Sequence, residues 1–155
     1  IDQDGAAPLH IAAHQSDIRY LNALLKRGAN VSQPNKIGQQ PLHVASESSY
    51  SIRQKRFFPK DEFVRGLVEH GADINAQGHL GTPLHSAVFG ANVSAFKELL
   101  RLGADRSLTN KEGRTPLEMA RHLNSNKFHT TSEVFRVKSE NRAKIIELLK
   151  SNLYE

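Results

Sequence analysis

The chain contains no cysteine among its 155 residues, so neither a disulfide framework nor a cysteine-rich zinc site can form. It also lacks a long apolar run, since no stretch approaches the ~18 residues that a membrane-spanning helix needs. We therefore expect no membrane span and a soluble, intracellular protein, either cytoplasmic or nuclear. A secreted effector that acts inside a host cell is a variant of this expectation.

Charge of one sign does not dominate either. Lys and Arg number 21 against 16 Asp and Glu, which gives a net charge of +5. This excess permits an acidic partner but does not require one. The sequence also has no phosphate-binding loop, no dinucleotide-binding motif and no Gly-x-Ser-x-Gly nucleophile motif. We predict that the chain is not an enzyme, with no catalytic residues and no cofactor.

What the chain does contain is a repeat. Four prolines stand 33, 42 and 33 residues apart, and each is followed by leucine. The tetrapeptides around them are Ala7-Pro8-Leu9-His10, Gln40-Pro41-Leu42-His43, Thr82-Pro83-Leu84-His85 and Thr115-Pro116-Leu117-Glu118. A second marker, a pair of apolar residues shortly before Gly-Ala, begins 16 residues after Pro8 and 16 residues after Pro83. Two markers that keep their mutual distance indicate a repeated structural unit.

This period and the Thr-Pro-Leu-His marker resemble the ankyrin repeat family. The resemblance covers nearly the whole chain apart from two insertions. It implies an all-α fold, an ankyrin-repeat solenoid of helix-turn-helix units with protruding β-hairpin-like turns. We predict one domain over 1–155, with repeats at about 2–34, 35–76, 77–109 and 110–152, the last being a terminal cap. The chain is expected to be a fragment of a larger protein.

The residues of one unit agree with this resemblance. Proline suits the first turn of a helix, because its fixed φ is helical and its missing N–H would have no partner there. Thr82 can cap the first helix of the third repeat, and Gly103 can end the second, because glycine accepts the left-handed conformation. Each helix is too short to be stable alone, so the next repeat must cover its apolar stripe. In the first repeat we predict helices over 8–15 and 18–27.

Two insertions interrupt the pattern. His43 and Gly71 are 28 residues apart where other repeats have 18, so ten residues are inserted within about 47–60. Serines and Pro59 predict a loop there, followed by Asp61 as the cap of the next helix. The second insertion, at about 124–140, is expected to be a polar loop with a helical turn from Ser132, before a final helix over about 141–150.

Eight histidines raise the alternative of a metal site. Three of them, His10, His43 and His85, occupy the same place in successive repeats, and packed helices lie about 8 to 10 Å apart, too far for ligands of one ion. In the ankyrin family this histidine bonds to the neighbouring turn, so we assign it a structural role. No pair of the remaining histidines has a helical metal-binding spacing backed by a carboxylate. We predict no metal site.

The resemblance implies that another protein binds the concave surface, made of the turn tips and the exposed side of the inner helices. We expect Phe89 to be the main contact, flanked by Arg114, because aromatic rings and arginine dominate binding energy at interfaces. Aligning the repeats puts these residues on the surface: Gln3, Asp4, His14, Gln15, Lys36, Ile37, Gln39, Glu47, His79, Leu80, Phe89, Lys111, Glu112, Arg114 and His122. The chain by itself is expected to be a monomer.

The first insertion carries a second candidate contact site. Its charged and aromatic residues could bind a partner, or the rings could pack back while the charges face solvent. These residues are Arg53, Lys55, Arg56, Phe57 and Phe58. Binding of nucleic acid or anionic lipid through them is the alternative function, weakened by the small charge excess and the lack of a nucleic-acid motif. A further alternative is a targeting module for an enzyme whose catalytic domain lies elsewhere in the parent protein.

Asn75 raises a hypothesis of modification. It follows Leu67 by eight residues and stands in the turn Asp73-Ile74-Asn75, which resembles the ankyrin asparagines that an asparaginyl hydroxylase modifies. The alternative is that Asn75 only stabilises the turn.

Overall fold

The computed structural model describes residues 7–15, 17–47, 50–51, 56–57, 60–125 and 133–151. The helices in these ranges are α1 (Pro8–Gln15), α2 (Ile18–Lys26), α3 (Pro41–Ser46), α4 (Asp61–Glu69), α5 (Pro83–Gly90), α6 (Val93–Arg101), α7 (Pro116–Ser125) and α8 (Glu133–Lys150). Two short strands, β1 (Tyr50–Ser51) and β2 (Arg56–Phe57), pair antiparallel. The predicted all-α fold is confirmed, and the strand pair lies within the first insertion.

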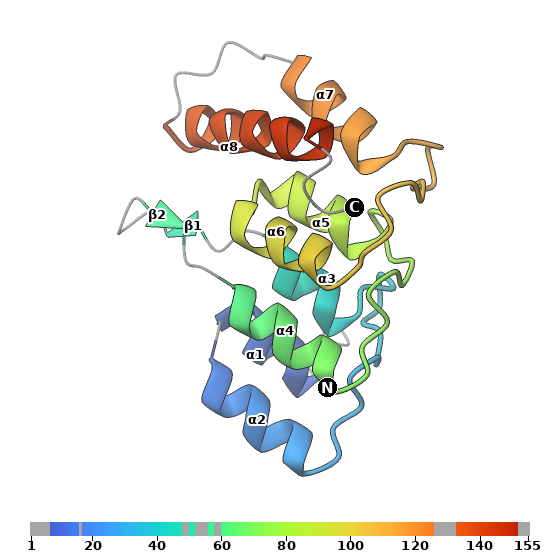
Figure 1. Ribbon diagram of the computed structural model, residues 1–155. Helices are drawn as coiled ribbons and strands as arrows, with labels where there is room; N and C mark the ends of the chain where they lie inside the picture. Colours follow the sequence, from blue (N-terminus) through green and yellow to red (C-terminus); the bar gives the residue numbers. More distant parts are fainter. Residues whose placement is uncertain are drawn as a thin grey trace.

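The helices form two rows along a stack (Figure 1). α1, α3, α5 and α7 pack successively in an inner row, and α2, α4 and α6 pack successively in an outer row. α8 extends the outer row at one end, where it packs on α6 and α7, and α2 lies at the opposite end. This arrangement is a solenoid, in which each helix pair mainly contacts its neighbours in sequence.

The core runs along the stack between the two rows. Small residues of the inner helices, such as Ala12, Ala45 and Ala87, are fully buried, which allows neighbouring helices to approach closely. The leucines that follow the second and third repeat prolines, Leu42 and Leu84, are fully buried as well. The same marker that reveals the repeat in the sequence therefore supplies its core.

The repeated histidines tie each repeat to the next turn. His43 Nε2 donates to the carbonyl oxygens of Ala76 (3.0 Å) and Gly81 (3.1 Å), and its Nδ1 accepts from the backbone N–H of Gln40 (3.2 Å). The corresponding histidines of the first and third repeats use both ring nitrogens in the same way. Their predicted structural role is confirmed.

The fourth repeat replaces this histidine by Glu118, which keeps only the local half of the arrangement. The Thr115 N–H donates to Glu118 Oε2 (2.8 Å), and the Glu118 N–H donates to Thr115 Oγ1 (3.3 Å). This reciprocal cap secures the start of α7. The hydrogen bonds from Thr115 lower the pKa of the Glu118 carboxyl.

The first insertion differs from the expected loop in two respects. Its strands pair Tyr50 with Phe57 and Ser51 with Arg56, so it contains a short hairpin ladder. The expected Asp61 cap is wrong, because α4 begins at Asp61 and its N-cap is Lys60, which makes no side-chain capping bond. The Lys60 side chain is buried instead, with only 2% exposed.

The second insertion is more helical than expected. α8 begins at Glu133, next to the helical turn expected from Ser132, and runs for 18 residues, so the expected separate start of the final helix at about 141 is wrong. The half-buried Val134, Phe135 and Lys138 supply packing at helical spacing in this segment, and Arg136 pairs with Glu140 one turn later (2.7 Å). α8 therefore continues from the insertion into the final repeat without interruption.

Buried cations satisfy carbonyl groups at the C-terminal ends of two inner helices. Lys60 Nζ donates to the Ala13 carbonyl in α1 (2.7 Å). Arg142 of α8 donates through Nε to the Val88 carbonyl (3.2 Å) and through Nη2 to the Phe89 carbonyl (3.0 Å) in α5. Positive charge is favourable at a helix C-terminus, where the last carbonyls generally lack a partner within the helix. The Val88 carbonyl also accepts from the Ala91 N–H (3.1 Å). Burial lowers the pKa of Lys60 to about 8.

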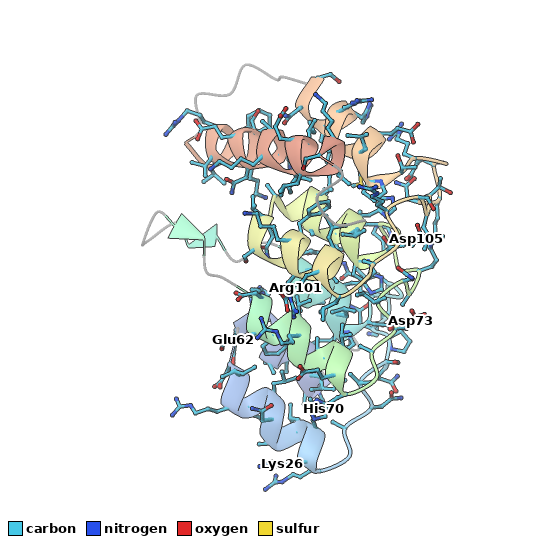
Figure 2. The ribbon with its side chains drawn as sticks, in the orientation of Figure 1. Lys26, Glu62, His70, Asp73, Arg101 and Asp105 are labelled. Atoms are coloured by element: carbon cyan, nitrogen blue, oxygen red, sulfur yellow. The ribbon has the colours of Figure 1, made fainter. Side chains whose placement is uncertain are left out.

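The outer helices α4 and α6 are joined by a buried carboxylate. Glu98 Oε1 accepts from Arg65 of α4 (2.7 Å) and from Arg101, one turn along α6 (2.7 Å). Figure 2 labels Arg101. The hydrogen bonds from Arg101 and Arg65 hold the pKa of Glu98 at about 2. None of the helices in the described ranges combines the length and the apolar character that crossing a membrane requires.

Candidate protein-binding face

We call the exposed side of α1, α3, α5 and α7, together with the turn tips at 35–38, 78–81 and 110–113, the inner face. Two of these tips are held by asparagine. Asn35 Oδ1 accepts from the N–H groups of Ile37 (3.1 Å) and Gln39 (2.9 Å). Asn110 holds the third tip through the same pair of bonds, to the N–H groups two and four residues later. The tip residues are therefore presented on a fixed backbone.

No strand pairing is assigned at these tips, because β1 and β2 are the only strands in the described ranges. The middle tip is nevertheless closed by a backbone bond from Gly78 N–H to the Gly81 carbonyl (2.9 Å). The β-hairpin-like character of the turns stays a prediction.

Uncovered apolar side chains concentrate on the inner face. Among the described residues, four large apolar side chains are exposed: Ile11 at 37%, Tyr20 at 39%, Ile37 at 56% and Phe89 at 43%. Ile11 and Phe89 belong to inner helices and Ile37 to a turn tip, whereas Tyr20 belongs to the outer helix α2. Exposed apolar surface of this kind is where a partner would gain most from burial.

A groove of about 350 Å³ lies between α1, α3 and the first turn tip. Its walls combine apolar and polar side chains: His10, Ile11, His14, Gln15, Asn35, Gln39, Val44 and Glu47. Four of these, His14, Gln15, Gln39 and Glu47, are residues that the sequence assigned to partner binding. Ile11 and Val44 were missed, although each stands three residues after a repeat proline and so one helical turn before His14 or Glu47.

Two of the predicted contact residues are engaged within the protein. The expectation that Gln39 faces outward is wrong: it is 8% exposed, its carbonyl accepts from His10 Nε2 (2.8 Å), and its side-chain amide donates to Glu47 Oε1 (2.6 Å). The reason is that the histidine of one repeat reaches into the turn of the next and draws Gln39 inward. Desolvation raises the pKa of the half-buried Glu47 carboxyl, although Lys60 opposes the shift.

Phe89 is exposed, as the sequence predicts, and its backbone is fixed. Arg142 donates to its carbonyl, and Ala91 two residues later has the left-handed φ of 58° that ends α5. Arg114 lies at the opposite end of α5, where its carbonyl accepts from His85 Nε2 (2.9 Å).

The remaining predicted residues fall into three groups. His14, Gln15, Lys36, Ile37, His79, Lys111, Glu112 and His122 are exposed, and Leu80 and Arg114 are half-buried. Gln3, Asp4, Arg53, Lys55 and Phe58 lie outside the described residues. Arg56 and Phe57 form β2, whose backbone alone is described. Their roles in binding stay predictions.

Asn75 bridges two successive turns. Its N–H donates to Asp73 Oδ1 (2.9 Å), and its own Oδ1 accepts from the Asp105 N–H in the next turn (2.9 Å). Figure 2 labels Asp73 and Asp105 on these successive turns. Asn75 therefore stabilises the stacking of turns, whatever else it does.

Within the described ranges, no group of three or more His, Asp or Glu side chains is placed to hold a metal ion. The inner face combines exposed apolar side chains with polar and charged neighbours.

Comparison with known proteins identifies the family. A family model described as ankyrin repeats in three copies matches residues 1–78, and a second, described as ankyrin repeats in many copies, matches residues 67–120. The chain belongs to the ankyrin repeat family. Ankyrin repeats are generally protein–protein interaction modules and generally non-catalytic.

The ankyrin relatives include proteins of different kinds. The B-cell lymphoma 3 protein homolog of Mus musculus is 33% identical over 121 residues, which is 76% of this chain and 25% of that protein. The tyrosine-protein kinase Shark of Drosophila melanogaster is 31% identical over 77% of this chain and 12% of its own length. The transient receptor potential cation channel subfamily A member 1 of the same organism is 30% identical over 77% of this chain and 10% of its own length. The ankyrin chain thus spans a quarter or less of each of these relatives.

Proposed function

We propose that this ankyrin chain is a non-catalytic scaffold that binds a partner protein through its inner face. The observation that carries the proposal is the exposure of Ile11, Ile37 and Phe89 along that face, among polar and charged neighbours. Apolar anchors surrounded by a polar rim are typical of protein–protein interfaces. The groove between α1 and α3 would take an apolar side chain of the partner, with Ile11 and Val44 in its walls.

Phe89→Ala tests this proposal. We expect the substitution to weaken partner binding by about 2 kcal/mol or more, because exposed aromatic side chains are typical anchors of interfaces. The free energy of unfolding should change little by comparison, since the ring already contacts solvent. The partner is first captured from lysate of the source organism or its host and identified by mass spectrometry. Its affinity for each variant is then measured by calorimetry at physiological salt.

Tyr20→Ala is the matched control. Tyr20 is an aromatic residue of nearly the same exposure, 39% against 43%, but it lies on the outer helix α2. Tyr20→Ala should bind the captured partner like the unmodified chain, and Arg114→Ala should bind it more weakly. If Phe89→Ala binds as tightly as Tyr20→Ala, the inner face is not the contact surface, and the first insertion becomes the next region to mutate.

We also propose that Asn75 is a substrate for an asparaginyl hydroxylase. Its side chain is half-buried and its Oδ1 is engaged by the next turn, so the added hydroxyl would have to be accommodated without loss of that bond. Mass spectrometry of protein purified from cells that contain such an enzyme should show one added oxygen at Asn75. Absence of that oxygen would count against the modification.

We propose that the chain acts inside the cell, in the cytoplasm or nucleus, and is a monomer when alone. The absence of cysteine is compatible with a reducing compartment. Fluorescence microscopy of the tagged protein and sedimentation velocity measure these two properties. Retention in the secretory pathway, or a sedimenting species of twice the expected mass, would contradict them.

A further inference from the structure

The two ends of the helical stack differ in chemistry. α8 lies at one end, and its exposed residues are almost all charged: Arg136, Glu140, Ala143, Lys144, Glu147 and Lys150. α2 lies at the other end (Figure 1) and carries a stripe of Tyr20, Ala23 and Leu24. Tyr20 and Ala23 are exposed, and Leu24 is half-buried. A repeat array needs polar outer faces on its terminal units. α2 also exposes Arg19, Asn22 and Lys26, but the apolar stripe interrupts this polar surface.

The stripe on α2 has counterparts at the same distance from the closing glycine in the next two repeats. The position eight residues before that glycine is Tyr20, Phe63 or Ala95, and these residues are 39%, 2% and 0% exposed. The position four residues before it is Leu24, Leu67 or Leu99. Leu24 in α2 is half-buried, whereas Leu67 in α4 and Leu99 in α6 are 0% exposed. Among these three repeats, the two positions are covered in the second and third, whereas the described residues leave them uncovered in the first.

A third position, between these two, shows which helix covers the stripe in the inner repeats. Five residues before the closing glycine stand Ala23, Gly66 and Glu98. A Cβ on Gly66 would lie 3.1 Å from Leu21 Cδ2 of α2, so this position on α4 faces the preceding outer helix. Glu98 likewise accepts from Arg65 of the preceding helix α4. In both cases the stripe packs against the outer helix of the repeat before it.

We propose that the stripe of Tyr20, Ala23 and Leu24 is a stacking interface for one further ankyrin helix pair, which precedes α1 in the same polypeptide. The interface continues the packing that already joins α2 to α4 and α4 to α6. Its occupant is therefore expected to be another outer helix of the same kind. The occupant presents apolar side chains from its own outer helix, in the positions that Ile18 and Leu21 hold on α2. This inference is independent of partner binding by the inner face.

A fusion tests whether the interface accepts a repeat. A copy of residues 77–109 is placed directly before Asp2 of the full chain, replacing Ile1. This junction puts the proline of the added copy 33 residues before Pro8, which is the spacing found between Pro83 and Pro116. A lone repeat cannot bury its apolar face, so the added copy folds only if it docks. We expect one cooperative urea transition with a raised midpoint and an m-value larger by about a fifth, in proportion to the added chain.

Two substitutions on α2 make the test specific. Tyr20→Lys places a charge within the stripe and should abolish the gain in midpoint and m-value in the fusion, while leaving the unfused chain nearly unchanged. Asn22→Lys adds the same charge at an exposed position of α2 outside the stripe and should keep the gain. An unchanged midpoint and m-value in the fusion, or a gain that survives Tyr20→Lys, would overturn the proposal.

Two further measurements separate the natural occupants. Sequencing the transcript upstream of the codon for Ile1 should reveal a Pro-Leu marker 33 residues before Pro8. An upstream segment without an ankyrin-type helix pair would overturn the proposal. Sedimentation of the unfused chain should show a monomer. A dimer that Tyr20→Lys dissociates would instead assign the stripe to a second copy of this chain.

Discussion

At the scale of single residues, the repeated histidines carry the most information. Each uses Nε2 to reach the next turn and Nδ1 to receive the backbone N–H at the start of its own helix, which fixes one neutral tautomer. Gly78 shows how closely the turn approaches this ring, because a Cβ there would lie 2.7 Å from His43 Nε2. Glycine is required at this position by the approach of the histidine and not by a left-handed φ.

Gly78→Ala should therefore destabilise the protein by about 1 to 3 kcal/mol, the usual cost of overpacking a filled site. Chemical denaturation measures the free energy of unfolding. The double variant with His43→Ala is the control, since removing the ring removes the clash. The two substitutions should be coupled by at least about 0.5 kcal/mol, and strictly additive effects would show that Gly78 is needed for another reason.

At the scale of elements, α8 is attached through its polar side chains as well as its apolar face. Arg142 is 7% exposed and donates to two carbonyls at the end of α5, while Ile145 of the same helix is fully buried. α8 thus closes the end of the stack and at the same time fixes the backbone that presents Phe89. The helix that the second insertion lengthens therefore supports the candidate contact residue.

Arg142→Ala should lower the free energy of unfolding by about 2 kcal/mol or more, because the Phe89 carbonyl loses its buried charged donor and the Val88 carbonyl keeps only the Ala91 N–H. Amide hydrogen exchange should also become faster in α8. Arg136→Ala on the same helix is the matched control. Its side chain is 65% exposed and pairs only with Glu140, so its loss should cost no more than about 0.5 kcal/mol. Equal effects of the two substitutions would refute the anchoring role of Arg142.

At the scale of the whole molecule, the connections between repeats depend on neutral histidines. Burial lowers the pKa of His43 and of His85 from the ordinary value of 6.5. A protonated ring would also lose the Nδ1 acceptor that receives the backbone N–H. Below about pH 6.5 the unfolded chain binds protons that the folded chain does not, so stability must fall as the pH falls through this region.

We expect the free energy of unfolding to decrease between pH 7 and pH 5, with a slope approaching about 1.4 kcal/mol per pH unit for each of His43 and His85. Urea denaturation across this range measures it. His43→Gln should destabilise the protein at every pH but flatten the slope. A His43→Gln variant with the original slope would contradict the assignment.

Much of this molecule was readable from the sequence, because repetition allows each local signal to be checked several times. The prolines, the Leu-His pairs and the glycines before alanine gave the helix pairs, and the exposure of Phe89 followed from its place in the repeat. The position of Gln39 could not be read in this way. Its residue type suits a surface, and only the approach of His10 from the preceding repeat draws it inward.

The sequence by itself determined the period, the all-α solenoid and the order of its units, because those depend on local helix signals and on a spacing that recurs. The tertiary structure decided which of the repeated positions are covered. Phe63 and Tyr20 hold the same place in their repeats, yet one is buried and the other exposed, because a preceding helix packs on the first and none of the described residues packs in that way on the second. Burial in a stack is a property of neighbours, and neighbours across repeats are set by packing.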